Sequence, residues 1–117
     1  MTVDWLKCKG EIWCELYKLD LSHSLLDVNG VFVIFGGNGT DDIIYVGKGN
    51  IKSELNKLAK DPAIAAFQSH GCFVTWAKVG VLTQSGIETY LVNRLKPKLN
   101  PKASKSIPIT VNLPWDN

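Results

Sequence analysis

Two short apolar runs joined by a glycine-rich turn are the feature that most limits how this chain can fold. The first run, "VFVIF" at 31–35, is apolar at every position, as in a strand that is covered on both faces. The turn "GGNGTDD" supplies glycines and short polar side chains, and residues 43–46 form the returning apolar run. The sequence therefore predicts an antiparallel hairpin.

The register of this hairpin decides on which face of the sheet Tyr45 lies. If Phe35 pairs with Ile43 and the pairing continues regularly, Phe32 and Tyr45 face opposite sides, because side chains alternate along a strand. A register moved by one residue, or a bulge near the glycines, would bring them to the same side. The sequence leaves both arrangements open.

Helical and strand periodicities continue outside the hairpin and define the fold class. Helical spacing of apolar residues predicts helices over 11–19, 51–60, 62–68 and 85–95, whereas alternation predicts a third strand at 72–79 and prolines suggest an extended edge segment at 107–113. We therefore expect an α+β fold, with a small central antiparallel three-stranded sheet flanked by helices.

The composition is that of an ordinary globular chain, with 45% hydrophobic and 21% charged residues in 117. Its longest clean apolar run has the length of a strand, so we expect no membrane association. The start "MTVDWLKCKG" lacks the pattern of a signal peptide, and the three cysteines, Cys8, Cys14 and Cys72, form no close pairs. We therefore expect free thiols and a cytoplasmic location.

Lysines gather in two segments. Residues 48–60 hold four lysines and one acid, and residues 94–105 hold five cations and no acid. Such segments could follow a phosphate backbone, although a solvated lysine face is the plainer interpretation. The cations considered for nucleic-acid binding are Lys48, Lys52, Lys57, Arg94, Lys96 and Lys98.

Several short motifs occur in the order found in one nuclease family. "GVF" at 30–32 and "YVG" at 45–47 stand on the two hairpin strands, "NIKSEL" at 50–55 follows, and "IETYLVNRLKPKLN" at 87–100 closes the region. Residues 30–101 thereby resemble the GIY-YIG nuclease superfamily. On this division, residues 1–29 form an N-terminal helical extension and 102–117 an extended C-terminal tail.

The resemblance implies metal-dependent hydrolysis of a phosphodiester bond in DNA. In that family a tyrosine activates the attacking water and a glutamate holds one divalent metal ion. By position, Tyr45 matches the tyrosine and Glu88 the glutamate, which implies an Mg²⁺ cofactor in an active enzyme. Gly30 and Gly47 match the motif glycines, and Asn100 matches the family's closing asparagine, for which we expect a structural role.

Two positions depart from the family pattern. Phe32 replaces the usual tyrosine of the first tripeptide, and Glu54 stands where an arginine contacts the scissile phosphate. A carboxylate there would repel the phosphate, whereas arginines that stabilise phosphoryl transfer accelerate it by about 10³–10⁵. Either Glu54 ligates a metal itself, or Lys48, Lys52 or Lys57 supplies the missing charge; Lys57 could equally pair with Glu54.

Three functions follow from these residues. The first is a GIY-YIG endonuclease-like domain with impaired hydrolysis. The second is an active DNA endonuclease in which a lysine such as Lys48 replaces the arginine. The third is a non-catalytic module that binds nucleic acid, a protein partner or a second copy of itself, with the helix over 11–19 as its expected surface. Glu88 also has a structural alternative, since Ser85 and Glu88 have the spacing of a capping box.

Overall fold

The computed structural model describes residues 1–37 and 42–116. Its four strands are β1 (Cys14–Glu15), β2 (Asn29–Gly36), β3 (Ile43–Asn50) and β4 (Cys72–Lys78), and its α-helices are α1 (Ile51–Ala59), α2 (Pro62–Ala65) and α3 (Val81–Leu95). Short 3₁₀ turns occupy Leu16–Lys18, Ser24–Leu26 and Gln68–His70. The predicted α+β class is confirmed.

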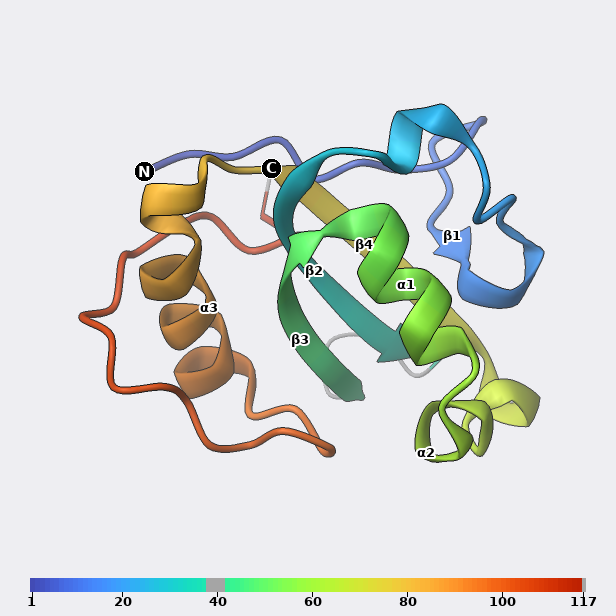
Figure 1. Ribbon diagram of the computed structural model, residues 1–117. Coiled ribbons are helices and arrows are strands. Elements are labelled where there is room, and N and C mark those ends of the chain that lie inside the picture. Colours follow the sequence, from blue (N-terminus) through green and yellow to red (C-terminus); the bar gives the residue numbers. More distant parts are fainter. Residues whose placement is uncertain (38–41, 117) are drawn as a thin grey trace.

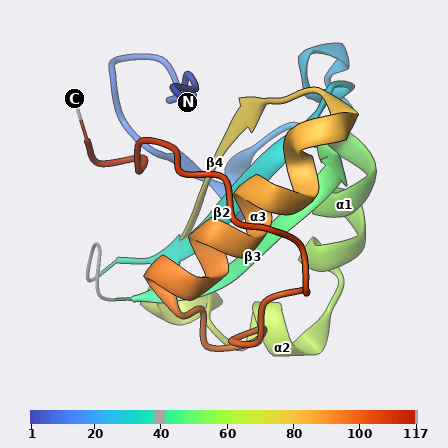
Figure 2. The same ribbon diagram turned by 90° about the vertical axis from the view of Figure 1, so that its left-hand side faces the viewer.

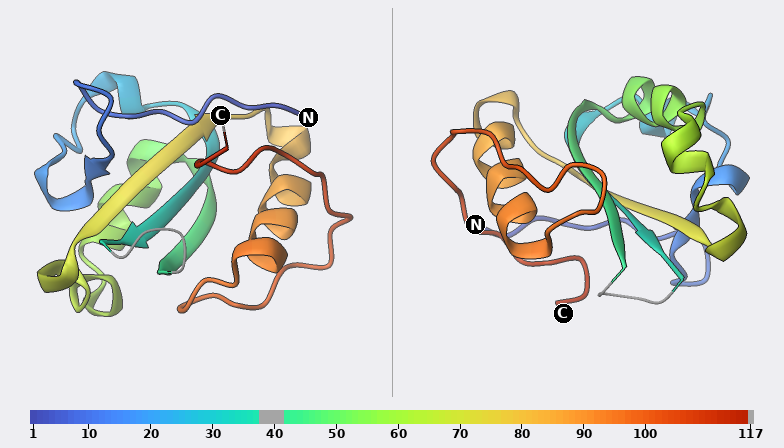
Figure 3. Two further views of the ribbon diagram at one scale, coloured as in Figure 1. Left: turned by 180° about the vertical axis from the view of Figure 1, so that it is seen from behind. Right: turned by 90° about the horizontal axis from the view of Figure 1, so that it is seen from below.

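The strands form one antiparallel sheet in the order β1-β4-β2-β3, so it has four strands where three were predicted. The predicted hairpin is β2–β3, although most of its turn lies outside the described residues. Helices α1 and α3 lie on opposite faces of the sheet, and both contact the edge strand β3 (Figures 1 and 3).

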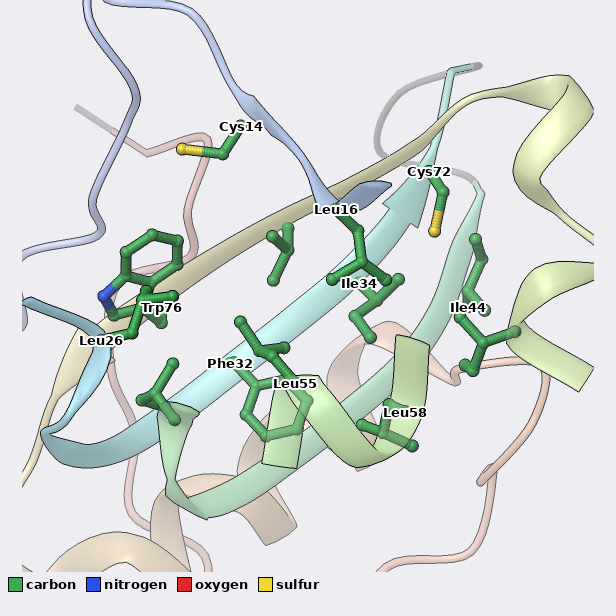
Figure 4. Packing of buried hydrophobic residues seen from close by; sticks show 13 residues of the cluster. Cys14, Leu16, Leu26, Phe32, Ile34, Ile44, Leu55, Leu58, Cys72 and Trp76 are labelled. Atoms are coloured by element: carbon green, nitrogen blue, oxygen red, sulfur yellow. The ribbon is translucent and has the colours of Figure 1, made fainter. Parts of the chain in front are cut away.

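Side-chain alternation divides the core into two clusters, one on each face of the sheet. Phe32 and Ile34 of β2 point toward α1, together with Trp76 of β4 (Figure 4). Val31 and Val33 point to the other face, toward α3. Strand β2 is thus buried on both sides, as its uninterrupted apolar run predicted.

Helix α1 begins and packs as the sequence predicted. The Asn50 side chain accepts a hydrogen bond from the Ser53 amide at 3.0 Å, which caps the helix. Ile51, Leu55 and Leu58 form its buried stripe. The short helix that follows reaches only Ala65, and a 3₁₀ turn replaces the rest of the predicted 62–68 helix.

The predicted helix over 11–19 is wrong, so residues 1–29 are not a helical extension. Cys8 and Cys14 form a disulfide, and between them Gly10 and Glu11 adopt left-handed φ values of 81° and 62°. This tight loop leads into β1 and a 3₁₀ turn, and the expected stripe residue Ile12 is 64% exposed. The free-thiol prediction is therefore wrong for this pair, whereas Cys72 is a free, buried thiol.

The C-terminal residues run along α3, and Trp115 packs edge-on against Phe35 of β2. The amide of Ile109 donates to the Gly86 carbonyl at 2.9 Å, and Val111 is buried (Figure 2). The expected edge segment at 107–113 is thus extended but not a strand. This segment leaves no room for a side chain at Gly86 of α3, because a Cβ there would lie 2.6 Å from the side chain of Ile109.

Within the described residues, no helix combines the length and apolar character that crossing a membrane requires.

Candidate functional site

The hairpin register places Tyr45 on the same face as Phe32. Phe35 pairs with Ile43, but the register then shifts, so that Ile34 pairs with Tyr45 and Phe32 with Gly47. Ile44 is the extra residue of this β-bulge. The rings of Phe32 and Tyr45 stack with their centroids 6.0 Å apart. The sequence left open whether Phe32 and Tyr45 lie on the same face. In the structure they do, because of the bulge.

Both motif glycines are required by close packing. A Cβ at Gly47 would lie 2.3 Å from Cζ of the Phe32 ring, and one at Gly30 would lie 1.9 Å from the Ala77 carbonyl oxygen of β4. Neither position can accept a side chain without displacement of its neighbour. Glycine at these positions therefore has a structural reason in addition to the one that the family motif implies.

Glu54 lies in the first turn of α1 and contributes negative charge near Tyr45. Burial raises the pKa of the Tyr45 hydroxyl, the Glu54 carboxylate raises it further, and Glu88 and Asp61 act in the same direction, whereas Lys57 opposes them. Glu54 also pairs with Lys57, its carboxylate 3.2 Å from the ammonium nitrogen. The positive end of the helix favours a carboxylate at this position.

Glu88 approaches from α3, on the other side of β3. This helix begins at Val81 after the Gly80 cap, four residues earlier than predicted, so Ser85 lies inside it. The capping-box alternative is therefore wrong, and the described residues give the Glu88 carboxylate no hydrogen-bond or ion-pair partner. Burial raises the pKa of Glu88, Lys48 lowers it, and Glu54 raises it.

Electrostatic effects on the pKa values of Tyr45 and Glu88 link four of the sequence-predicted residues in one site at the edge of the sheet. Tyr45 and Lys48 come from β3, Glu54 from α1 and Glu88 from α3, and each influences the ionisation of at least one other member or is influenced by one. We call this set the β3-edge site. Its two carboxylates outnumber its one lysine, so its local charge is negative unless Lys57 is included.

Apart from Lys57, which pairs with Glu54, the other cations considered for nucleic-acid binding lie outside this site. Arg94 is exposed in the last turn of α3, and Lys96 ends that helix in a left-handed conformation. The Lys98 ammonium forms an ion pair with Asp42 across the start of β3. Lys52 acts on the carboxylate of Asp20, whose pKa it lowers slightly. No cation of the 94–105 segment is among the charges that act on Tyr45 or Glu88.

Asn100 holds the outer edge of β3. Its side-chain amide donates to the Val46 carbonyl at 2.5 Å and accepts from the Val46 amide at 3.2 Å. The backbone amides of Lys98 and Leu99 bond to the carbonyls of Ile43 and Ile44. These contacts hold the backbone on both sides of Tyr45, a positioning role that the sequence motif alone did not specify. The Asp42–Lys98 pair was also missed, because its members are 56 residues apart.

The donor atoms of the β3-edge site suit a metal ion that takes only one or two ligands from the protein. Among residues 1–37 and 42–116, no three histidine, cysteine or acidic side chains gather in a way that could hold a metal. Mg²⁺ is nevertheless often bound by one or two carboxylates, with waters and substrate phosphates completing its coordination. The half-buried Glu88 carboxylate, which has no partner in the described structure, fits this requirement, and Glu54 is the second candidate ligand.

Comparisons of the chain with protein-family models, with curated proteins and with solved structures found no match.

Proposed function

We propose that the chain is a GIY-YIG endonuclease-like domain whose hydrolysis of phosphodiester bonds is impaired. The observation that carries this proposal is the composition of the β3-edge site. The charges of Glu54 and Glu88 act on Tyr45, and those of Lys48 and Glu54 act on Glu88, so four side chains from three elements form one linked set. Three of them occupy the positions at which the family motif has its functional residues, and the fourth, Lys48, is a candidate replacement for the missing cation.

The impairment follows from the charge that Glu54 brings to the site. A phosphodiester that approached Tyr45 would meet this carboxylate instead of a guanidinium. Burial and Glu54 also raise the pKa of Tyr45, so a smaller fraction of the phenol is ionised at neutral pH and available to act as a general base. Both effects slow the same reaction, and neither disturbs the fold.

Glu88 would hold the Mg²⁺ ion that such a reaction requires. A bound magnesium would neutralise charge on the phosphate and on the leaving oxygen. The Glu88 carboxylate is available for this task because α3 begins too early for it to cap the helix. Lys48 opposes the effect of burial on Glu88, because its charge lowers the pKa of the carboxyl and so favours the ionised, metal-binding form.

The closeness of Lys48 to Glu88 favours one alternative function, that of an active DNA endonuclease. Lys48 is the cation of β3 nearest in sequence to Tyr45, and its ammonium acts on Glu88. It could contact the scissile phosphate in place of arginine, although an ammonium group lacks the bidentate geometry of a guanidinium.

Nicking of supercoiled plasmid DNA with and without Mg²⁺ tests both functions. The impaired enzyme should nick slowly and only with Mg²⁺, and Glu88→Gln and Tyr45→Phe should each abolish the residual rate. For the impaired enzyme, Lys48→Met should lower the residual rate only modestly, through its effect on Glu88. For the active enzyme, the same change should remove most of a fast rate. Nicking that survives both Glu88→Gln and Tyr45→Phe would contradict the assignment of the site.

The cytoplasmic location expected from the sequence stays a prediction. It assumed reduced cysteines, whereas disulfides persist mainly in oxidising compartments. Since Cys8 and Cys14 are bonded in the structure, their redox state in cells is the direct test. Trapping thiols with an alkylating reagent during lysis should find both cysteines reduced if the chain resides in the cytoplasm.

A further inference from the structure

The positive charge of the chain is concentrated near its C-terminal end. Residues 89–115 hold five of the 13 cations and none of the 11 acids, so the remaining residues, with eight cations and eleven acids, carry a net charge of −3. The five cations all fall within residues 94–105, which we call the basic loop. They are exposed to solvent: Arg94, Lys96, Lys98, Lys102 and Lys105.

Hydrogen bonds hold the basic loop at two places. After α3 the chain crosses to the start of β3, where two loop amides donate to the carbonyls of Ile43 and Ile44 at 3.0 Å. It then returns to α3, where the hydroxyl of Ser104 lies 2.8 Å from that of Thr89 and hydrogen-bonds to it. Figure 1 shows this path from the end of α3 toward β3 and back alongside the helix. The two arms of the loop therefore flank the C-terminal half of α3.

The backbone of the basic loop is restricted further by two prolines. Pro97, which is buried, and Pro101 each fix one φ angle. Lys96 ends α3 in a left-handed conformation, and its amide donates to the Val92 carbonyl at 2.9 Å. A segment that is already ordered loses less conformational entropy on binding than a flexible tail does. The cations are thus presented on a preformed backbone.

Four of the five cations have no ion-pair partner among the described residues. Only Lys98 has one, the Asp42 carboxylate at the start of β3. Charges of alternating sign are typical of a solvated face, and the pair of Glu54 and Lys57 is an example in this chain. The basic loop has no acid with which to form such pairs. Its four unpaired cations therefore create a positive potential that attracts an anionic partner.

The distribution of these cations suits a polymer of phosphates better than one small anion. They are spread over both arms of the loop, and a small anion would contact only one or two of them. Double-stranded DNA carries about one negative charge per 1.7 Å of its axis, so it offers phosphates to several cations at once. Arg94, the only arginine of the chain, supplies a planar fork of donors that can grip a phosphate in bidentate geometry.

We propose that the basic loop binds the phosphate backbone of a double-stranded nucleic acid and leads it past the β3-edge site. The loop is bonded to β3 on both sides of Tyr45, through the backbones of Ile44 and Val46. A phosphate backbone held on the loop would therefore run beside the strand that carries the candidate hydroxyl. The choice of a nucleic acid rests on the proposed function, whereas binding by this surface does not require cleavage.

The salt dependence of binding measures how many cations contact phosphates. Four contacts predict a slope of log K against log salt concentration of about −3.6 for a duplex of about 20 base pairs. Fluorescence anisotropy in EDTA measures this slope without Mg²⁺-dependent cleavage. Lys102→Gln/Lys105→Gln should reduce the slope to about −1.8 and weaken binding by about 10- to 100-fold at about 50 mM salt. Arg94→Gln should reduce the slope by about 0.9.

Lys9→Gln/Lys78→Gln is the matched control, because it removes the same charge from two exposed lysines outside the basic loop. It should leave the slope unchanged. A duplex RNA of the same sequence should give a slope similar to that of the DNA, since both present phosphates to the loop. An equal loss of slope in the two double variants would overturn the proposal. So would polyglutamate or phosphatidylserine vesicles that displace DNA as well as unlabelled DNA does, which would identify an acidic protein or a membrane as the partner.

The two proposals fail separately. Binding with the expected slope by a protein that never nicks plasmid DNA would support the basic loop and contradict the proposed hydrolysis. Mg²⁺-dependent nicking that requires Glu88, in a protein whose DNA binding is indifferent to Lys102→Gln/Lys105→Gln, would support the hydrolysis and overturn the role of the loop.

Discussion

The aromatic rings of Phe32 and Tyr45 stack on one face of the sheet, with their planes inclined by 18°. The β-bulge at Ile44 makes this possible, because it turns Tyr45 toward the face that Phe32 occupies. Gly47, paired with Phe32 across the hairpin, leaves the space that the ring fills. The position of the candidate catalytic hydroxyl therefore depends on a bulge, a ring and a missing side chain.

Gly47→Ala should destabilise the fold, because its new Cβ would overlap the Phe32 ring. Overpacking of this kind costs about 1–3 kcal/mol, measured as the free energy of unfolding in urea. Gly80→Ser is the control, since no atom lies within 4 Å of a Cβ there and serine is at least as good as glycine at the N-cap that Gly80 occupies, so this change should not lower stability. Phe32→Leu in the Gly47→Ala background should recover part of the loss. Equal stability of the two single variants would contradict the packing described here.

Glu54→Gln should lower the pKa of Tyr45, because Glu54 is the largest charged contributor to its rise. The ¹³Cζ resonances of the tyrosines report their ionisation, and Tyr45→Phe assigns the relevant one among the three. Glu15→Gln is the matched control, since Glu15 also pairs with a lysine three residues later but lies in β1. If Glu54→Gln moved the Tyr45 titration no more than Glu15→Gln does, Glu54 would not act on the site.

Glu88→Gln should stabilise the protein at neutral pH. Because burial raises the pKa of Glu88, the folded chain holds this proton more tightly than the unfolded chain, and stability falls as the pH rises from 4.5 through the folded pKa. Glutamine stays neutral and avoids this loss. Thermal unfolding of both proteins should therefore agree below about pH 4 and diverge at pH 7. A lower melting temperature for Glu88→Gln at pH 7 would indicate a structural role for the carboxylate instead.

The cysteines should give one thiol per chain in denaturant without reductant, and three after reduction. In the native protein that single thiol should react slowly, because Cys72 is 4% exposed and burial raises its pKa to about 11. Reaction with a chromogenic disulfide reagent measures both the count and the rate. Three thiols without reductant would mean that Cys8 and Cys14 are not bonded.

The parts of the fold with strong local periodicity could be predicted from the sequence. The β2–β3 hairpin, α1 and β4 all follow from spacing, capping and alternation. The helix over 11–19 could not be excluded, because the spacing of its apolar residues is helical. The disulfide between Cys8 and Cys14, which closes a tight loop there, was not predicted. The early start of α3 was missed because Val81 and Leu82 are exposed and add nothing to its buried stripe.

The candidate site could be predicted as a set of residues but not as an arrangement. Motif positions identified Tyr45, Glu54 and Glu88, yet whether they meet depends on how α1 and α3 pack around β3. The bulge that orients Tyr45 depends on tertiary packing as well, since both registers satisfy local preferences. The buried indole nitrogen of Trp76, for which the described residues offer no acceptor, could not be predicted at all, because a tryptophan in an alternating strand is ordinary core.

The rate of Mg²⁺-dependent plasmid nicking by Glu54→Arg, relative to wild type, tests the central claim most directly. If the carboxylate of Glu54 is what impairs the site, the arginine should accelerate nicking by about 10³- to 10⁵-fold. Glu15→Arg, which breaks an equivalent ion pair in β1, should change nothing. A folded Glu54→Arg protein that nicks DNA no faster than wild type would contradict the account.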